Sequence, residues 1–216
     1  MSIKNQISII NNEIKDKADL IAVSKTRSVE QITEAYNQGQ KKFGENRVHE
    51  IVEKYNNLPK DIEWHMIGHL QKNKVKHISK FISLIHSLDR LSLAKEIDKN
   101  AKKENRSIDC LIQIKISNDE SKYGLNPEQL DSFYTDLKEF ENINTIGLMA
   151  MATFTKDQNL IADEFKKMEN LFKEMKTIDS NFKILSIGMS DDYILAINNG
   201  SNMIRVGSKI FGQRNY

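Results

Sequence analysis

Cysteine and proline are nearly absent from this chain of 216 residues, which contains one Cys and two Pro. A single cysteine cannot form a disulfide within the chain, so a disulfide-stapled fold is excluded and a reducing, cytoplasmic compartment is expected. Cys110 lies in an apolar run and is expected to be a buried, unreactive thiol. No Pro-, Gly- or Ser-rich linker interrupts the sequence, which predicts a single domain over residues 1–216.

The chain also lacks an excess of one charge and a long hydrophobic run. Its 32 Lys and Arg nearly balance 30 Asp and Glu, which argues against a nucleic-acid-binding character along the whole chain. The modest basic run at 72–77 is expected to be a solvated face. No apolar stretch approaches the ~20 residues that span a bilayer, and the first residues lack the apolar core of a signal peptide. Neither a nucleic-acid partner nor a membrane is expected.

Short apolar runs alternate with longer amphipathic segments. The strands predicted from these runs are 20–23, 42–44, 64–67, 84–86, 110–116, 143–149, 184–187 and 203–206. Apolar residues three and four apart predict helices over 29–38, 91–103 and 160–175, and an extra helix is expected over 3–14. Asp89 is expected to cap the helix over 91–103, and Asn126-Pro127 to open another helix.

A strand followed by a helix, repeated about eight times, indicates βαβ units and a parallel sheet. Such a sheet is either open and doubly wound or closed as a barrel. An open nucleotide-binding sheet usually carries a glycine-rich loop after its first strand, and the segment 23–27 contains no glycine. The sequence therefore favours an α/β fold with a single (β/α)8 TIM-type barrel.

Functional groups in such a barrel follow the carboxyl ends of the strands. Lys25 directly follows the first predicted strand, where partial desolvation would lower its pKa and supply the neutral amine that imine formation needs. A solvated surface lysine is the alternative. Glycine and serine follow the last two strands, in 188–190 and at Gly207-Ser208, where barrels recurrently bind phosphate. Ordinary helix caps would explain the same residues.

Arg205 lies inside the otherwise apolar last strand, so it must be paired or serve a ligand. An imine lysine, a phosphate-binding turn and this arginine together suggest pyridoxal 5'-phosphate (PLP). An arginine beside the pyridine nitrogen disfavours its protonation and makes the ring a weaker electron sink. That environment suits racemisation or simple holding of the cofactor better than demanding carbanion chemistry.

Many segments also resemble the pyridoxal phosphate homeostasis proteins of the YggS/PROSC type, from about residue 18 to the C-terminus. They are AVSKT at 22–26, FGEN at 43–46, EWHMIG at 63–68, LQKNK at 70–74, SLD at 87–89, GLM at 147–149, GMSDD at 188–192 and RVGSKIFG at 205–212. The resemblance implies the barrel of the alanine racemase N-terminal domain, PLP fold type III. It makes Lys25 the imine lysine, puts Asn46 beside the ring and sets Arg205 against the pyridine nitrogen.

The same resemblance assigns the phosphate to Ser190, Gly207 and Ser208, with the main chain near Met189. It implies a PLP carrier in cofactor homeostasis rather than an enzyme, with apo PLP-dependent enzymes as recipients, and a monomer. An amino-acid racemase is the alternative. Racemases that resemble this barrel take a second base, a tyrosine, from an added β-domain of a partner subunit, and the sequence ends at Tyr216, soon after the last predicted strand.

Two further hypotheses concern residues outside this set. Lys122 follows the fifth predicted strand and could receive the aldehyde transiently during handover. His65 and His69 are four residues apart, but that spacing presents two metal ligands together only on a helix, and Gly68 and a strand end intervene. A metal site is therefore not expected.

Overall fold

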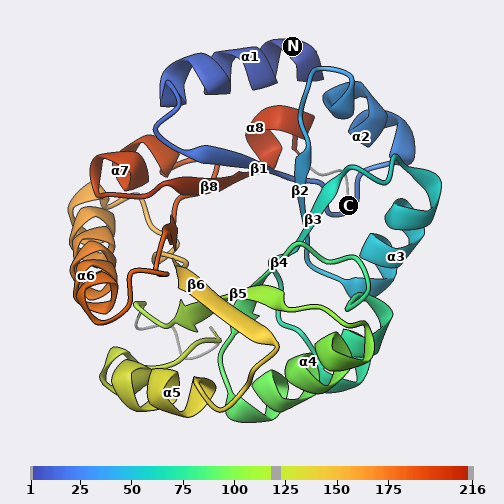
Figure 1. The fold of residues 1–216 in the computed structure, drawn as a ribbon. Helices are drawn as coiled ribbons and strands as arrows, with labels where there is room; N and C mark the ends of the chain where they lie inside the picture. The colour runs from blue at the N-terminus through green and yellow to red at the C-terminus, as the bar shows by residue number, and fades with distance from the viewer. Residues whose placement is uncertain (1, 118–122, 214–216) are drawn as a thin grey trace.

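A computed structural model describes residues 2–117 and 123–213. Eight parallel strands close into a barrel in chain order, which confirms the predicted (β/α)8 fold (Figure 1). The strands are β1 (Asp19–Val23), β2 (Lys42–Glu45), β3 (Glu63–Met66), β4 (Leu84–Leu88), β5 (Ile108–Ile114), β6 (Ile143–Ala150), β7 (Ile184–Ser186) and β8 (Met203–Val206). Each lies within a few residues of its predicted position, including the weakly indicated β2.

The helices form a ring around the barrel, as Figure 1 shows. They are α1 (Ile3–Ile14), α2 (Val29–Tyr36), α3 (Val48–Asn57), α4 (Leu91–Lys103), α5 (Leu130–Leu137), α6 (Gln158–Ile178), α7 (Tyr193–Asn198) and α8 (Ser208–Phe211). The expected extra helix is α1, which packs against α2, α7 and α8. No helix in the described part of the chain has the length and apolar composition that crossing a bilayer would require.

Local signals explain where several helices begin. Ser28 and Gln31 form a reciprocal capping box at the start of α2. Asn126 forms another with Gln129, and the predicted helix start there is a 3-10 turn (Pro127–Gln129) that leads into α5. The basic run Lys72–His77 is also a 3-10 helix, with its charged side chains exposed around the buried Val75.

The prediction that Asp89 caps α4 is wrong. The N-cap residue of α4 is Arg90, and it makes no capping hydrogen bond through its side chain. The Asp89 carboxylate instead pairs with Arg90 NH1 at 2.5 Å and lies 3.8 Å from His69 Nδ1. The Asp89 carboxylate therefore pairs with the Arg90 side chain instead of accepting a hydrogen bond from the first N–H groups of α4.

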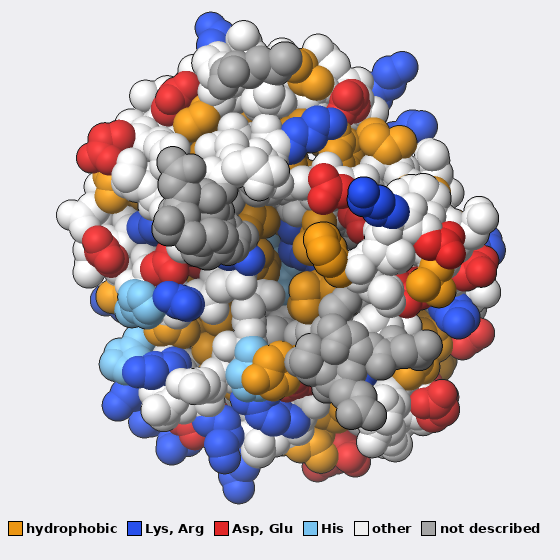
Figure 2. Space-filling model, turned by 180° about the vertical axis from the view of Figure 1, so that it is seen from behind, with side chains coloured by type: hydrophobic (Ala, Val, Ile, Leu, Met, Phe, Trp, Pro, Cys, Tyr) orange, Lys and Arg blue, Asp and Glu red, His pale blue; other side chains and the backbone are white. Residues whose placement is uncertain are grey.

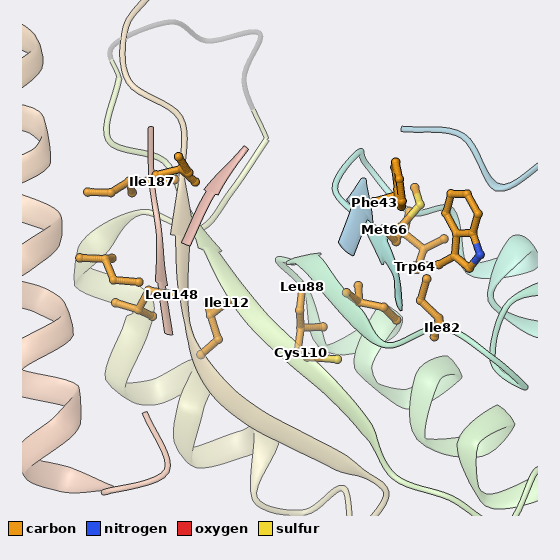
Figure 3. Close-up of a cluster of buried hydrophobic side chains, with 14 of the residues drawn as sticks. Phe43, Trp64, Met66, Ile82, Leu88, Cys110, Ile112, Leu148 and Ile187 are labelled. Carbon is orange, nitrogen blue, oxygen red and sulfur yellow. The ribbon is translucent and has the colours of Figure 1, made fainter. Parts of the chain in front are cut away.

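Most of the core lies between the barrel and its helices. Figure 3 shows part of this outer core, where Phe43 and Trp64 on neighbouring strands lie with ring centroids 5.9 Å apart. Cys110 belongs to the same cluster, fully buried and free, as expected. Burial raises the pKa of its thiol far above the ordinary value, which explains an inert thiol.

A second, smaller cluster fills the barrel interior. Its buried residues, here called the apolar layer, are Ile21, Leu84, Leu111, Met149 and Met203. They come from five different strands and meet because alternate side chains of each strand point inward. The same alternation decides which residues reach the carboxyl end of the barrel from inside.

Candidate cofactor site at the barrel mouth

A cavity of about 480 Å³ opens at the carboxyl ends of the strands. Figure 2 shows a hollow near the centre of this face, with Lys or Arg and His side chains visible inside it. All seven residues assigned to the cofactor from the sequence line this cavity. They are Lys25, Asn46, Met189, Ser190, Arg205, Gly207 and Ser208. Segments that follow β1, β2 and β7 meet there with the end of β8.

The period of two along each strand explains this convergence. Ile21 belongs to the apolar layer, so Val23 points to the same side and lines the cavity, and Lys25 lines it from the turn that follows β1. Met203 is likewise followed by Arg205 two residues along β8. A close backbone approach adds Asn46: a Cβ on Gly68 would lie 2.5 Å from the Asn46 carbonyl oxygen, so only glycine fits beside it.

Lys25 is half-buried, and a buried polar cluster behind β1 and β2 fixes the residue before it. Ser24 Oγ donates to Glu45 Oε1 at 2.6 Å. Lys54 Nζ, on α3, donates to Ser24 O at 2.8 Å and to Glu45 Oε1 at 2.6 Å. Because Ser24 is held through both its hydroxyl and its carbonyl, the start of the Lys25 segment is anchored to β2 and α3.

The residue after Lys25 is tied to the same helix. Thr26 N donates to Glu50 Oε2 at 2.7 Å, and Glu50 lies 3.3 Å from Lys54 Nζ. Thr26 has φ 64°, a conformation that costs a non-glycine residue about 1 kcal/mol or more. The hydrogen bond from Thr26 N to Glu50 stabilises that conformation. It thereby also fixes the direction in which Lys25 leaves the barrel wall.

The carboxylate of Glu45 is fully buried, and its Oε2 has no hydrogen-bond partner within residues 2–117 and 123–213. Burial raises the pKa of Glu45 to about 7, although the charge and hydrogen bond of Lys54 act in the opposite direction. The cluster of Ser24, Glu45 and Lys54 therefore supports the Lys25 segment, and this support depends on whether Glu45 is protonated.

Arg205 is 4% exposed, and no carboxylate in the described part of the chain lies within ion-pair distance of it. Its NH1 donates to Ser186 O at 2.7 Å and to Ser186 Oγ at 2.6 Å, and its NH2 donates to Ala150 O at 2.8 Å. Burial lowers the pKa of the guanidinium to about 10, which still leaves it charged at neutral pH. The buried ion pair that the sequence left open is therefore not found among the described residues, and the arginine faces the cavity as a cation.

The turn after β7 lies against the end of β8. Gly207 N donates to Ser190 Oγ at 3.2 Å, which joins the two predicted phosphate-binding segments. Gly188 has φ 93°, and a Cβ there would lie 2.6 Å from Ala196 Cβ, so the turn requires glycine. The first N–H groups of α8 have no intrahelical acceptors and can bind an anion together with the Ser190 hydroxyl.

Two features of this turn work against an anion. Met189 N already donates to Asp192 Oδ1 at 2.5 Å, so the main chain at Met189 has no N–H to offer in this conformation. Asp191 and Asp192 also line the cavity, and burial raises the pKa of Asp192. The phosphate contact expected of the Met189 main chain therefore fits less well than that of the Ser190 hydroxyl, and the Gly207 N–H is likewise already bonded, to Ser190 Oγ.

One contact at the mouth was not identified from the sequence, that between His69 and Tyr123. His69 and Tyr123 stack with ring centroids 3.9 Å apart and join the segments after β3 and β5.

His65 lies deeper than His69 and pairs with His86, so the two histidines considered as metal ligands, His65 and His69, have different surroundings. The described residues contain no group of three metal ligands. Lys122 lies outside the described residues.

The donor set of the cavity fits PLP. It offers an amine at the rim, a buried cation that can only donate hydrogen bonds, and a turn whose Ser190 hydroxyl can donate to an anion, all lining the same cavity. The inward alternation of β1 and β8 could have located Arg205 and its neighbours from sequence. The cluster formed by Glu45, Lys54 and Ser24 could not, because it depends on which face of α3 packs on β2.

Comparison with known proteins agrees with this geometry. The family model for the alanine racemase N-terminal domain matches residues 1–215. A pyridoxal phosphate homeostasis protein of Aquifex aeolicus is 41% identical over 202 residues, covering 92% of this chain and 88% of that protein. The protein of the same name from Escherichia coli K12 is 36% identical over 205 residues, covering 93% and 88%.

Solved structures show the same relationship. PipY of Synechococcus elongatus superposes with a TM-score of 0.91 at 32% identity, covering 98% of this chain and all of that one, and it is also known with PLP bound. Alanine racemase of Clostridium difficile shares only the fold, with a TM-score of 0.80, 17% identity and 60% of its own length covered. The chain is thus a member of the alanine racemase N-terminal domain family and belongs, within it, to the pyridoxal phosphate homeostasis proteins.

Proposed function

We propose that this protein binds PLP at the barrel mouth as an imine on Lys25, and that it holds and delivers the cofactor in cytoplasmic PLP homeostasis. One observation carries the proposal: the amine of Lys25, the buried guanidinium of Arg205 and the turns at Ser190 and Gly207-Ser208 line a single cavity. The PLP-bound structure of PipY supports it, because that protein is 32% identical over almost the whole chain. Bound PLP would supply an aldehyde for the amine and an electron-withdrawing ring.

Each residue has a distinct part in this proposal. Lys25 supplies the amine, and Asn46 lies beside the ring. Arg205 donates to the pyridine nitrogen, because a guanidinium cannot accept a hydrogen bond. Ser190, Gly207 and Ser208 hold the phosphate, and Met189 contributes its main chain only if Asp192 releases its N–H.

The test is an absorbance spectrum of the PLP-loaded protein before and after borohydride reduction, followed by peptide mass mapping. We expect a visible imine band that reduction removes, and a reduced adduct on Lys25. Lys25→Ala should lose the band and keep the fold, with Lys41→Ala as the control because Lys41 pairs with Asp61 and lies over the Tyr36 ring on the surface, outside the lining of the cavity. An adduct mapped to a different lysine would refute the assignment.

The alternative is a PLP-dependent enzyme such as an amino-acid racemase. Such an enzyme needs an acid–base group on each face of the cofactor. Among the described residues that line the cavity, Tyr123 is the one tyrosine, and its ring is exposed and stacked on His69. Steady-state assays over an amino-acid panel separate the two: a kcat above ~1 per second that falls in Tyr123→Phe would establish the enzyme.

Delivery is tested with an apo PLP-dependent enzyme whose activity returns as it receives the cofactor. We expect the loaded protein to restore activity, and Lys122→Ala to slow transfer while the absorbance of the bound cofactor stays intact. Unchanged transfer in that variant would remove Lys122 from the proposal. Sedimentation of the loaded protein should show a monomer.

A further inference from the structure

A continuous line of hydrogen bonds runs from the cavity into the barrel. Arg205 NH1 donates to Ser186 Oγ at 2.6 Å, Ser186 Oγ lies 3.3 Å from His86 Nδ1, and His86 Nε2 lies 3.0 Å from His65 Nδ1. These four residues, here called the polar layer, come from β8, β7, β4 and β3 and are all at least 96% buried. Of the seven residues assigned to the cofactor, Arg205 is the one that belongs to this line, so the line reaches the site through Arg205.

The direction of this line follows from its first member. A guanidinium only donates, so Ser186 Oγ accepts from Arg205 and has its own proton left for His86 Nδ1. His86 then carries its proton on Nε2 and donates it to His65 Nδ1. The opposite direction would leave the Ser186 hydroxyl proton without an acceptor among the described residues, and a buried unsatisfied donor is costly.

Nothing in this line can neutralise Arg205. Burial lowers the pKa of His65 to about 3 and that of His86 well below its ordinary value, so both rings are neutral at physiological pH. The three bonds from NH1 and NH2 go to Ser186 and Ala150, on the sides of the guanidinium that face β7 and β6. The remaining N–H edge of Arg205 is therefore available to the cavity that it lines.

We propose that Ser186, His86 and His65 are positioning residues that fix the orientation of Arg205, so that the site selects a ligand atom that is an uncharged hydrogen-bond acceptor. This inference rests on the proposed function, in which that atom is the pyridine nitrogen of PLP. If His86 cannot accept from Ser186, the hydroxyl proton has no acceptor among the described residues, the hydroxyl leaves its present rotamer to reach one, and the guanidinium loses one of its three fixed partners. The contact with the ring nitrogen then weakens, while the imine and phosphate contacts remain.

Two substitutions of His86 distinguish the loss of the hydrogen-bond acceptor for Ser186 from a change in side-chain volume. In His86→Asn the amide oxygen can replace Nδ1 as the acceptor for Ser186, whereas the longer side chain in His86→Gln reaches toward His65 and places no acceptor at the Nδ1 position. Ser87→Ala is the control, because Ser87 is the next residue of β4, is equally buried, and its hydroxyl has no hydrogen-bond partner in the part of the chain that the structure describes. All three variants keep Lys25, Arg205 and the phosphate turn.

The measurement compares the affinity for PLP with that for its analogue in which carbon replaces the ring nitrogen. We expect His86→Gln to bind PLP about tenfold more weakly and the analogue unchanged, as loss of a hydrogen bond to a charged group predicts. His86→Asn and Ser87→Ala should stay close to the wild type for both ligands. Using the ratio of the two affinities cancels any loss of folded protein.

Equal losses for both ligands, or no loss for either, would overturn the positioning role and leave PLP binding on Lys25 intact. A second measurement uses the protein without ligand. Nitrogen NMR should show both imidazoles in the Nε2–H form, and slowly exchanging Arg205 side-chain protons that His86→Gln makes faster. An Nδ1–H form of His86, or unchanged exchange at Arg205, would contradict the inference even if PLP did not bind at all.

Discussion

Two layers of inward-facing side chains lie one above the other in the barrel and consist of opposite residue types, and β4 and β8 contribute a residue to each layer. Leu84 belongs to the apolar layer, and His86, two residues further along β4, belongs to the polar layer. On β8 the same step leads from Met203 to Arg205. On both strands the two residues face inward, so the layers differ in the type of side chain that they present.

The contrast separates the groups that stabilise the barrel from those that serve the site. Burying an apolar side chain contributes about 1.5–3 kcal/mol to stability. A buried hydrogen-bonded polar group contributes a much smaller net amount, because it gives up its bonds to water. The polar layer therefore contributes less to the stability of the barrel than apolar side chains in the same place would. Its position directly beneath the cavity indicates that it supports a ligand.

The largest effect should come from the apolar layer. Leu111 is completely buried, and Leu111→Ala should lower the free energy of unfolding by about 3 kcal/mol, since it removes apolar contact and leaves a cavity. Urea denaturation measures this loss. The affinity of the folded fraction for PLP should not change, because Leu111 does not line the mouth. A loss of PLP affinity as large as that of His86→Gln would abolish the distinction between the layers.

The two layers should also differ in their response to acid. In the unfolded chain His65 and His86 titrate near their ordinary pKa of 6.5, whereas burial lowers both values in the folded protein. The unfolded chain then takes up protons that the folded one refuses, so stability is fully present above pH ~6.5 and falls as the pH decreases. At pH 5 His65 alone should cost about 2 kcal/mol.

The test for this acid response is denaturant unfolding between pH 7 and pH 5 in wild type and in His65→Leu/His86→Leu. Glu45 acts with the opposite sign: its raised pKa favours the folded state below about 4.5, and that contribution is lost as the pH rises to about 7. Subtracting the double variant from the wild type removes this shared term. A wild type that loses no more stability toward pH 5 than the double variant would show that the histidines are protonated in the folded protein.

Much of the fold was predictable because it depends on local pattern. Every strand and the extra helix α1 followed from apolar runs and helical spacing, and closure of the barrel followed from the lack of glycine in segment 23–27. The cap at Asp89 was not predictable, because the pairing of its carboxylate with Arg90 depends on side-chain geometry that the helix pattern does not contain.

The site divides in the same way. Lys25, Arg205 and the Gly207 turn were identified because each follows or interrupts a recognisable strand. The positions of His65 and His86 relative to Arg205 depend on how β3, β4 and β8 face one another across the barrel, which only the closed structure defines. Period-two alternation places His86 inward from sequence, but it does not say which inward residue lies opposite.

The smallest effect should come from a conservative change in the apolar layer. Met203→Leu keeps the volume and the apolar character of the side chain, so it should cost less than ~1 kcal/mol of folding free energy and leave PLP affinity unchanged.

The matched change two residues along β8 is Arg205→Lys. It keeps the charge but loses the planar guanidinium, which donates to Ser186 and to Ala150 at the same time. It should weaken PLP binding at least tenfold. Equilibrium titration with PLP compares the two variants; if Met203→Leu weakens binding as much as Arg205→Lys does, shape rather than hydrogen bonding governs the polar layer.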